Sequence, residues 1–87
     1  MVCSALFHCI DYCTFSDGDV VGGEEEYLGT TTSEQLCAAL VKRKRPWCIG
    51  ATWGGSTGAN ECYAEHGHTI QSKNGWRACL FPGIIIH

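Results

Sequence analysis

The clearest pattern of hydrophobic and polar positions falls in residues 32–45, where it has the period of an α-helix. Leu36, Cys37, Leu40 and Val41 form one apolar stripe at the i, i+1, i+4, i+5 spacing of a helix face. The stripe predicts an amphipathic helix whose apolar side, Cys37 included, packs against the rest of the domain.

Both ends of this predicted helix carry termination signals. The basic run at residues 42–45 falls in the last turn, where cations meet the negative end of the helix dipole, and Pro46 then stops the helix. At the other end a capping box is available in two registers, Thr32 with Gln35 or Thr31 with Glu34.

Segments rich in strand-favouring residues lie on either side of the helix. They predict strands over residues 5–15, 47–53, 61–65 and 76–81. Glycine and polar residues predict a turn at 16–19, loops at 22–26 and 54–60, and a hairpin turn at 72–75.

This order of elements, strands followed by one helix and then strands, indicates an α+β fold. We expect a small disulfide-rich domain with one α-helix packed on an antiparallel β-sheet. Residues 1–87 are one domain's worth of chain. Residues 82–87 form an apolar C-terminal tail, which either pairs as an edge strand or stays exposed as a contact surface.

Seven cysteines in 87 residues suggest how so short a chain is stabilised. A domain of this size has a thin core and usually needs disulfides or a metal. The only close pair is Cys9 and Cys13, whereas structural zinc favours two such pairs. We therefore expect disulfides and a secreted, extracellular protein, with zinc or free thiols as the alternative. An odd count leaves at least one thiol over, and sequence alone does not fix the pairing.

The charge pattern limits the classes of partner. A net charge of −3 does not favour nucleic-acid binding, and no apolar run approaches the roughly 20 residues of a membrane span. The densest charge is the run Lys42, Arg43, Lys44 and Arg45. It is either a solvated helix end or a local site for a sulfated glycan, an anionic surface or an acidic partner, which Arg77 joins if the fold brings it close.

Large aromatic residues are a second set of candidate binding residues. Trp47, Trp53 and Trp76, with Tyr63, are many for this length, and we expect two of the three tryptophans in the core. Trp53 borders the glycine-rich loop 54–60, so we expect it to be the exposed one, available for sugar stacking or for a protein contact.

The histidines and glutamates invite a metal or catalytic interpretation. His66 and His68 share a face of an extended segment, with Glu65 or His8 to complete a metal corner. The glutamates at 24–26 lack the ligand spacing of an EF-hand loop and are expected on the surface. No nucleophile or phosphate-binding motif is present. We therefore expect no metal, no cofactor and no enzymatic activity.

Three cysteine-bearing segments lie within residues 33–81, namely Ser33-Glu34-Gln35-Leu36-Cys37, Cys48-Ile49-Gly50-Ala51-Thr52-Trp53 and Glu61-Cys62-Tyr63-Ala64-Glu65. Through these segments, the stretch from Ser33 to Phe81 resembles a PAN/apple-like module. With Trp76-Arg77-Ala78-Cys79-Leu80-Phe81, the chain is also similar to cysteine-rich domains of secreted marine-invertebrate proteins.

The PAN/apple-like resemblance implies a disulfide from the helix to a strand, Cys37 with Cys62. It also implies a second bond from Cys9 or Cys13 to Cys79, and it leaves Cys3 and Cys48 open. The family usually has a second helix cysteine where this chain has Val41, so Cys48 substitutes for it or the disulfide set differs.

The resemblance implies binding rather than catalysis. We expect a recognition or adhesion module for an extracellular glycan or protein, with contacts from the predicted loops 16–26, 54–60 and 66–75. One alternative is a small secreted effector such as a toxin, antimicrobial or inhibitor. Another is a structural subunit that forms homo-oligomers through the odd cysteine or the apolar tail.

Overall fold

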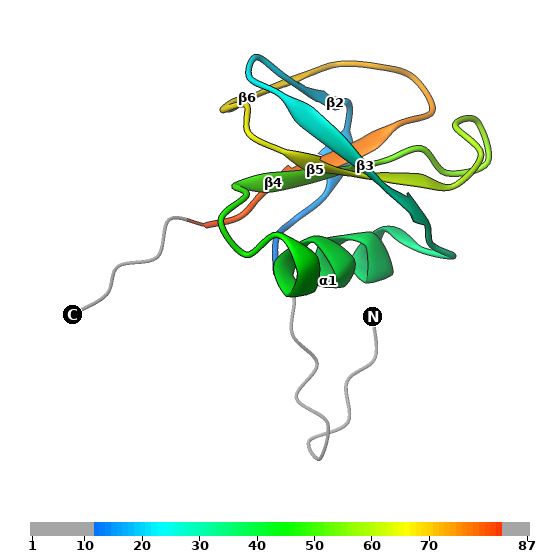
Figure 1. The fold of residues 1–87 in the computed structure, drawn as a ribbon. Helices are drawn as coiled ribbons and strands as arrows, with labels where there is room; N and C mark the ends of the chain where they lie inside the picture. The colour runs from blue at the N-terminus through cyan, green and yellow to red at the C-terminus, as the bar shows by residue number, and fades with distance from the viewer. Residues whose placement is uncertain (1–11, 83–87) are drawn as a thin grey trace.

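A computed structural model describes residues 12–82 of the chain (Figure 1). One helix, α1 (Glu34–Lys44), lies between three strands before it and four after it. The strands are β1 (Ser16–Asp17), β2 (Asp19–Val21), β3 (Glu25–Thr30), β4 (Gly50–Trp53), β5 (Glu61–Glu65), β6 (Thr69–Gln71) and β7 (Arg77–Leu80).

Five of these strands form an antiparallel sheet in the order β1-β7-β4-β5-β3, with β4 at its centre. The helix α1 covers one face of this sheet (Figure 1). The other face is covered by a two-stranded ribbon of β2 and β6, which we call the β2–β6 ribbon. The predicted α+β class, with one helix on an antiparallel sheet, is confirmed.

The start of α1 is set by Ser33, whose backbone is extended and whose side chain accepts a hydrogen bond from the Leu36 N–H at 3.2 Å. This is the usual role of an N-cap serine. The predicted caps Thr32 and Thr31 were therefore wrong. Thr31 instead donates its hydroxyl hydrogen to the Ser33 carbonyl oxygen at 2.9 Å.

The buried side of α1 consists of Cys37, Ala38 and Val41. Successive helix residues are about 100° apart, so a face that includes Ala38 turns Leu36 away from the sheet. Leu36 is 52% exposed, and its predicted place on the buried stripe was wrong. Arg45 closes the other end by donating its backbone N–H to the Val41 carbonyl oxygen at 2.7 Å.

The first predicted strand and turn need correction. Residues 5–11 of the predicted strand at 5–15 lie outside the described part, and residues 12–15 are not a strand. The predicted turn at 16–19 holds two short strands that separate at Gly18. Gly18 has φ +150°, and a Cβ there would lie 2.6 Å from the Gln71 carbonyl oxygen, so the chain crosses from the sheet to the ribbon where only glycine fits.

The later strands match the sequence more closely. Strand β5 occupies the predicted residues, residues 54–60 form the expected loop, and β7 lies inside the predicted strand at 76–81. The strand predicted at 47–53 begins only at Gly50. The turn at 72–75 is not a hairpin turn, because it joins β6 and β7, which pair with other strands.

Two predicted loops contain strands. The segment 22–26 enters β3 at Glu25, and the segment 66–75 contains β6. Strand β3 is a sheet edge, so exposed glutamates fit there and discourage further pairing.

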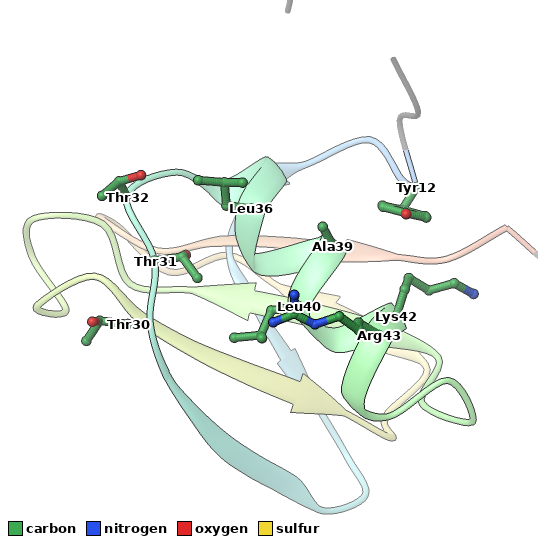
Figure 2. A pocket seen from close by; sticks show the side chains of 9 residues that line it. All are labelled: Tyr12, Thr30, Thr31, Thr32, Leu36, Ala39, Leu40, Lys42 and Arg43. Atoms are coloured by element: carbon green, nitrogen blue, oxygen red, sulfur yellow. The ribbon is translucent and has the colours of Figure 1, made fainter. Parts of the chain in front are cut away.

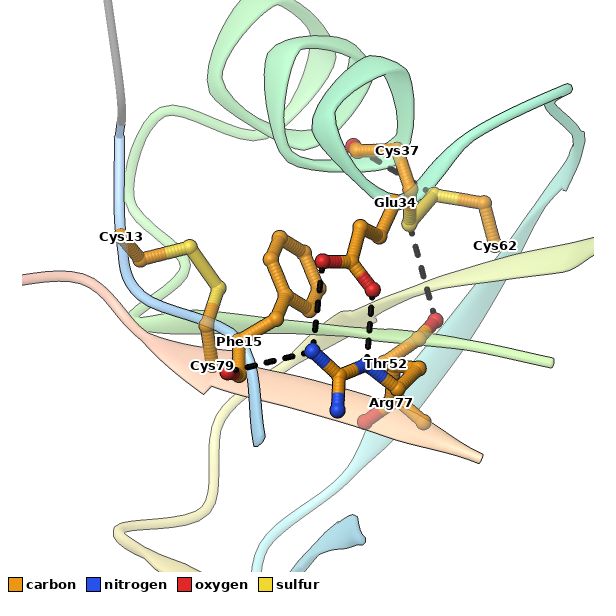
Figure 3. The surroundings of a disulfide bond; sticks show 8 residues. All are labelled: Cys13, Phe15, Glu34, Cys37, Thr52, Cys62, Arg77 and Cys79. Carbon is orange, nitrogen blue, oxygen red and sulfur yellow. Dashed lines mark hydrogen bonds and ion pairs between the residues drawn. A yellow bond between two sulfur atoms is a disulfide. The ribbon is translucent and has the colours of Figure 1, made fainter. Parts of the chain in front are cut away.

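The core lies between α1 and the sheet and is built from small side chains and sulfur. It contains Cys37, Val41, Cys48, Ala51, Cys62, Ala64 and Cys79. Disulfides join Cys37 to Cys62 and Cys13 to Cys79 (Figure 3). The first pair is the one that the resemblance implies. For the second, the resemblance left Cys9 or Cys13 open, and the partner of Cys79 is Cys13. Both bonds lie on the helix side of the sheet.

Of the remaining cysteines, only Cys48 lies within the described residues. Cys48 is the unpaired cysteine among residues 12–82, and it is 4% exposed. Cys3, Cys9 and the tail residues 83–87 lie outside the described part. No helix within residues 12–82 has the length and apolar character needed to cross a membrane.

Candidate functional site

An open groove of about 720 Å³ runs over the outward side of α1 (Figure 2). Its floor is the exposed flank of the helix, and Figure 2 shows Tyr12 on one side of α1 and three threonines on the other. We call this the α1 groove, and its lining residues are Tyr12, Thr30, Thr31, Thr32, Leu36, Ala39, Leu40, Lys42 and Arg43.

The floor of the α1 groove is set by the rotation of α1 about its own axis. Leu36, Ala39 and Leu40 have the i, i+3, i+4 spacing of one helix stripe, which lies beside the buried one. Leu40 also packs partly against the core, whereas Leu36 is half exposed. The domain thus leaves an apolar strip of its helix in contact with solvent.

The threonine wall is held in place by hydrogen bonds from two other parts of the fold. The Thr31 N–H donates to the Asn60 carbonyl oxygen at 3.0 Å, and the Trp53 indole Nε1–H donates to the Thr31 carbonyl oxygen at 3.1 Å. Thr30 and Thr32, on either side, are exposed. The wall therefore presents hydroxyl groups on a fixed backbone.

Two members of the predicted basic cluster line one end of the α1 groove. Lys42 is partly buried, with its Nζ 4.9 Å from the centre of the Phe81 ring, and Arg43 is exposed. Lys44 is exposed on the same turn but does not line the groove. Among residues 12–82 no carboxylate forms an ion pair with any of these three cations.

Arg45 does not belong to that set of unpaired cations. Its guanidinium donates to the Glu26 carboxylate, with Nε to Oε1 at 2.7 Å and Nη2 to Oε2 at 2.5 Å. This hydrogen-bonded pair lowers the pKa of Glu26. Arg45 therefore ties the end of α1 to β3, and its charge is already matched.

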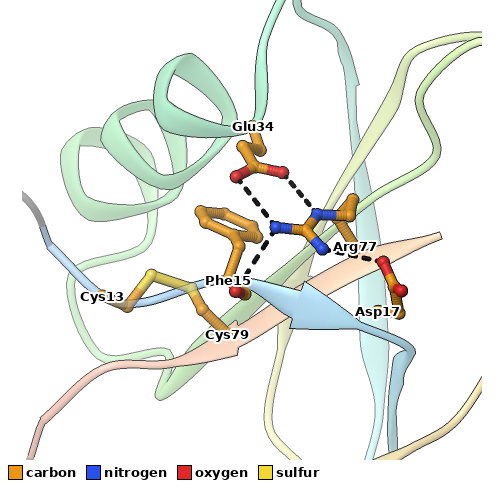
Figure 4. Close-up of polar contacts among 6 residues, drawn as sticks. All are labelled: Cys13, Phe15, Asp17, Glu34, Arg77 and Cys79. Atoms are coloured by element: carbon orange, nitrogen blue, oxygen red, sulfur yellow. Dashed lines mark hydrogen bonds and ion pairs between the residues drawn. A yellow bond between two sulfur atoms is a disulfide. The ribbon is translucent and has the colours of Figure 1, made fainter. Parts of the chain in front are cut away.

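Arg77 lies at the opposite end of α1 and does not join the basic cluster (Figure 4). Its Nε donates to Glu34 Oε1 at 2.8 Å, and its Nη1 donates to Asp17 Oδ1 at 2.7 Å. These partners, Glu34 first, raise the pKa of Arg77. The residue links β7 to β1 and to the first turn of α1, which is a structural role.

The exposed tryptophan is Trp47 rather than Trp53. Trp53 is partly buried against the core and hydrogen-bonds through its indole N–H, so its predicted exposure was wrong. Trp47 is 64% exposed, beside the Arg45 guanidinium at 5.8 Å from the ring centre. Trp76 is partly buried and lies 6.1 Å from the Tyr63 ring.

The two described histidines of the predicted metal corner, His66 and His68, do not lie in a common site. His66 Nε2 lies 3.4 Å from the Cys48 sulfur, whereas His68 is exposed, and His8 lies outside the described part. Burial raises the pKa of the Cys48 thiol. A buried, protonated thiol is a poor nucleophile, so this pair serves packing better than chemistry.

Sequence reasoning missed most of the α1 groove. It used the threonines only as caps and placed Leu36 in the core. One available signal was the alanine at position 38, which shifts the buried face away from Leu36. Tyr12 could not have been placed, because its position depends on the disulfide at Cys13 next to it.

The chain matches no protein-family model, no curated protein and no solved structure. What the fold itself defines is the class: a small α+β domain rich in disulfides. The resemblance to PAN/apple-like modules stays a prediction.

Proposed function

We propose that this domain is an extracellular recognition module that binds an anionic glycan in the α1 groove and works by binding rather than catalysis. The observation that carries the proposal is the placement of Lys42 and Arg43, without ion-pair partners among the described residues, at one end of that groove.

The distribution of positive charge supports this choice of ligand. The chain has six lysines and arginines and a net charge of −3. Arg45, Lys73 and Arg77 are paired with described carboxylates, whereas Lys42, Arg43 and Lys44 are not. Of the three unpaired cations, Lys42 and Arg43 line the α1 groove, so this acidic protein offers a local site for anions there despite its overall charge.

The chemistry of the lining suits a sulfated or carboxylated sugar. An arginine guanidinium donates two parallel hydrogen bonds to a carboxylate or sulfate, and a lysine adds a mobile point charge. The hydroxyls of Thr30 and Thr32 can exchange hydrogen bonds with sugar hydroxyls, and Tyr12 offers a ring face. The disulfides are consistent with the extracellular setting in which such glycans occur.

The test is binding to immobilised heparin and to an array of sulfated and neutral oligosaccharides. We expect the domain to be retained on heparin. The double variant Lys42→Gln/Arg43→Gln should bind at least about a hundredfold more weakly, since each of the two lost charge-assisted hydrogen bonds contributes about 1.5–3 kcal/mol and each 1.4 kcal/mol is a factor of ten. The matched control is Lys44→Gln/Lys73→Gln, which removes the same charge outside the groove.

Two outcomes would count against the glycan site. One is retention no stronger than that of an inert protein of equal net charge. The other is an equal loss in the two double variants, because binding would then follow total charge and not the groove.

A protein partner is the second candidate, favoured by the exposure of Trp47 next to Arg45. Tryptophan and arginine are enriched at the centres of protein interfaces. A second copy of the chain is the simplest partner to test, by sedimentation over a wide range of concentrations. Self-association that Trp47→Ala abolishes would favour this candidate over the glycan.

A further inference from the structure

Three carboxylates from distant parts of the chain meet between the main sheet and the β2–β6 ribbon. They belong to Asp19 in β2, Glu25 in β3 and Glu65 in β5, and one oxygen from each lies within 4.8 Å of the others. Glu25 and Glu65 are directly paired across the two strands. Like charges in that position repel each other, so the arrangement needs a compensating charge or proton.

The central member of this group is buried and unsatisfied. Glu65 is 1% exposed, and its Oε2 has no hydrogen-bond partner among the described residues. A buried carboxylate without partners is costly, and it is retained when it is neutralised, paired or bound to a metal. Within residues 12–82 the ion pair to this group comes from Lys73, whose exposed Nζ lies 3.9 Å from Asp19 Oδ2.

The geometry points to a calcium site formed by Asp19, Glu25 and Glu65. Calcium takes six to eight oxygen ligands at 2.3–2.6 Å, so oxygens on opposite sides of one ion are about 4.8 Å apart. The three carboxylate oxygens fit inside that span. Their charge and the single oxygen type suit a hard cation rather than a transition metal.

The remaining ligands of such an ion would be water. A cavity of about 290 Å³ lies against Asp19 and is lined by Val21, Gln71, Ser72 and Lys73. Asp19 is the member of the group that lines this cavity, so solvent reaches the group at Asp19. The site is independent of the α1 groove, since the sheet separates the two.

The test is calcium titration of the full chain, with its disulfides intact and stripped of metal by a chelator, by calorimetry and by thermal unfolding. We expect saturable binding on the order of 10⁻⁴–10⁻³ M, the range of extracellular calcium modules, and a melting temperature that rises with calcium concentration. Asp19→Asn and Glu25→Gln each weaken binding about tenfold or more.

Glu24→Gln is the matched control, because it removes the same charge from the exposed neighbour of Glu25. It should bind calcium within about twofold of the unchanged protein. Glu65→Gln keeps the side-chain volume and should fold without calcium, but its melting temperature should no longer respond to the ion. Heparin retention should be unchanged in all four variants.

The inference is overturned if calcium produces neither heat nor a melting shift in the unchanged protein. It is also overturned if sodium chloride at equal ionic strength produces the same shift, or if Glu24→Gln loses as much affinity as the three ligand variants.

Discussion

The two faces of the five-stranded sheet are joined to their covering layers in different ways. On the helix face, α1 is fixed by the Cys37–Cys62 disulfide and packs through Cys37, Ala38 and Val41 (Figure 3). On the other face, the β2–β6 ribbon rests on polar groups. The Val20 N–H donates to the hydroxyl of the buried Thr52 at 3.2 Å, and Glu65 is buried nearby.

This difference shows how a short chain stabilises two thin layers. The helix side has too few large apolar side chains for a conventional core, so covalent bonds restrict its unfolded state instead. The ribbon side has no disulfide among the described residues and depends on hydrogen bonds and on the protonation or ion binding of a carboxylate. The first layer should respond to reductant, and the second to pH and cations.

The largest expected effect is the loss of a disulfide from the helix side. The bonds close separations of 66 residues for Cys13–Cys79 and 25 for Cys37–Cys62. Chain entropy then predicts that Cys13→Ala/Cys79→Ala lowers the free energy of unfolding by about 4.4 kcal/mol and Cys37→Ala/Cys62→Ala by about 3.5 kcal/mol. Urea unfolding of each double variant measures this.

The control for the disulfide variants is Cys48→Ala, which removes a buried sulfur that closes no loop. It should cost about 1–2 kcal/mol, the range of an ordinary small core truncation. If it cost as much as the double variants, packing rather than loop closure would hold the helix face.

The contrast between the faces also explains what the sequence could predict. The apolar positions of α1 and β5 recur with periods of about 3.6 and 2 residues, so both elements can be predicted from the local sequence. The ribbon strands β2 and β6 have three residues each, which is too few to show a period. They form because the chain passes from the sheet to the ribbon at Gly18. Their pairing depends on contacts that no local pattern encodes.

The residues of the candidate sites could likewise be predicted only where the local sequence defines them. The basic run at 42–45 was visible as composition, but only the fold shows that Glu26 pairs with Arg45 and that Arg77 lies at the far end of the helix. Trp53 was misplaced because its bond to Thr31 joins residues that are 22 apart in the chain. The carboxylates of Asp19 and Glu65 come together only when the ribbon folds over the sheet.

The next effect is a dependence of stability on pH that arises from Glu65 on the ribbon face. Burial, with Glu25 and Asp19 adding to it and the Thr52 hydroxyl opposing it, raises the pKa of Glu65 from 4.5 to about 8. The folded protein thus holds this proton more tightly than the unfolded chain does. Its contribution to stability is complete below pH 4.5 and is lost as pH rises to about 8.

Thermal unfolding with a chelator present, at pH values from 4.5 to 8.5, measures this dependence. We expect the melting temperature of the unchanged protein to fall across the window more steeply than that of Glu65→Gln, which cannot titrate. Parallel curves for the two proteins would show that Glu65 is ionised in the folded state and is compensated by other groups.

The smallest effect tests whether the polar contacts hold the ribbon at all. Thr52→Val keeps the shape of the side chain but removes the acceptor for the Val20 N–H. An unsatisfied buried donor costs about 1–3 kcal/mol, less than either disulfide. Amide hydrogen exchange should then be faster in β2 and β6 and unchanged in α1, because the helix layer keeps its covalent tie.

Thr69→Val, on an exposed position of β6, is the control and should leave exchange in both layers unaltered. Faster exchange in α1 as well would mean that the two faces unfold as one cooperative unit, and the contrast between them would then describe contacts and not stability.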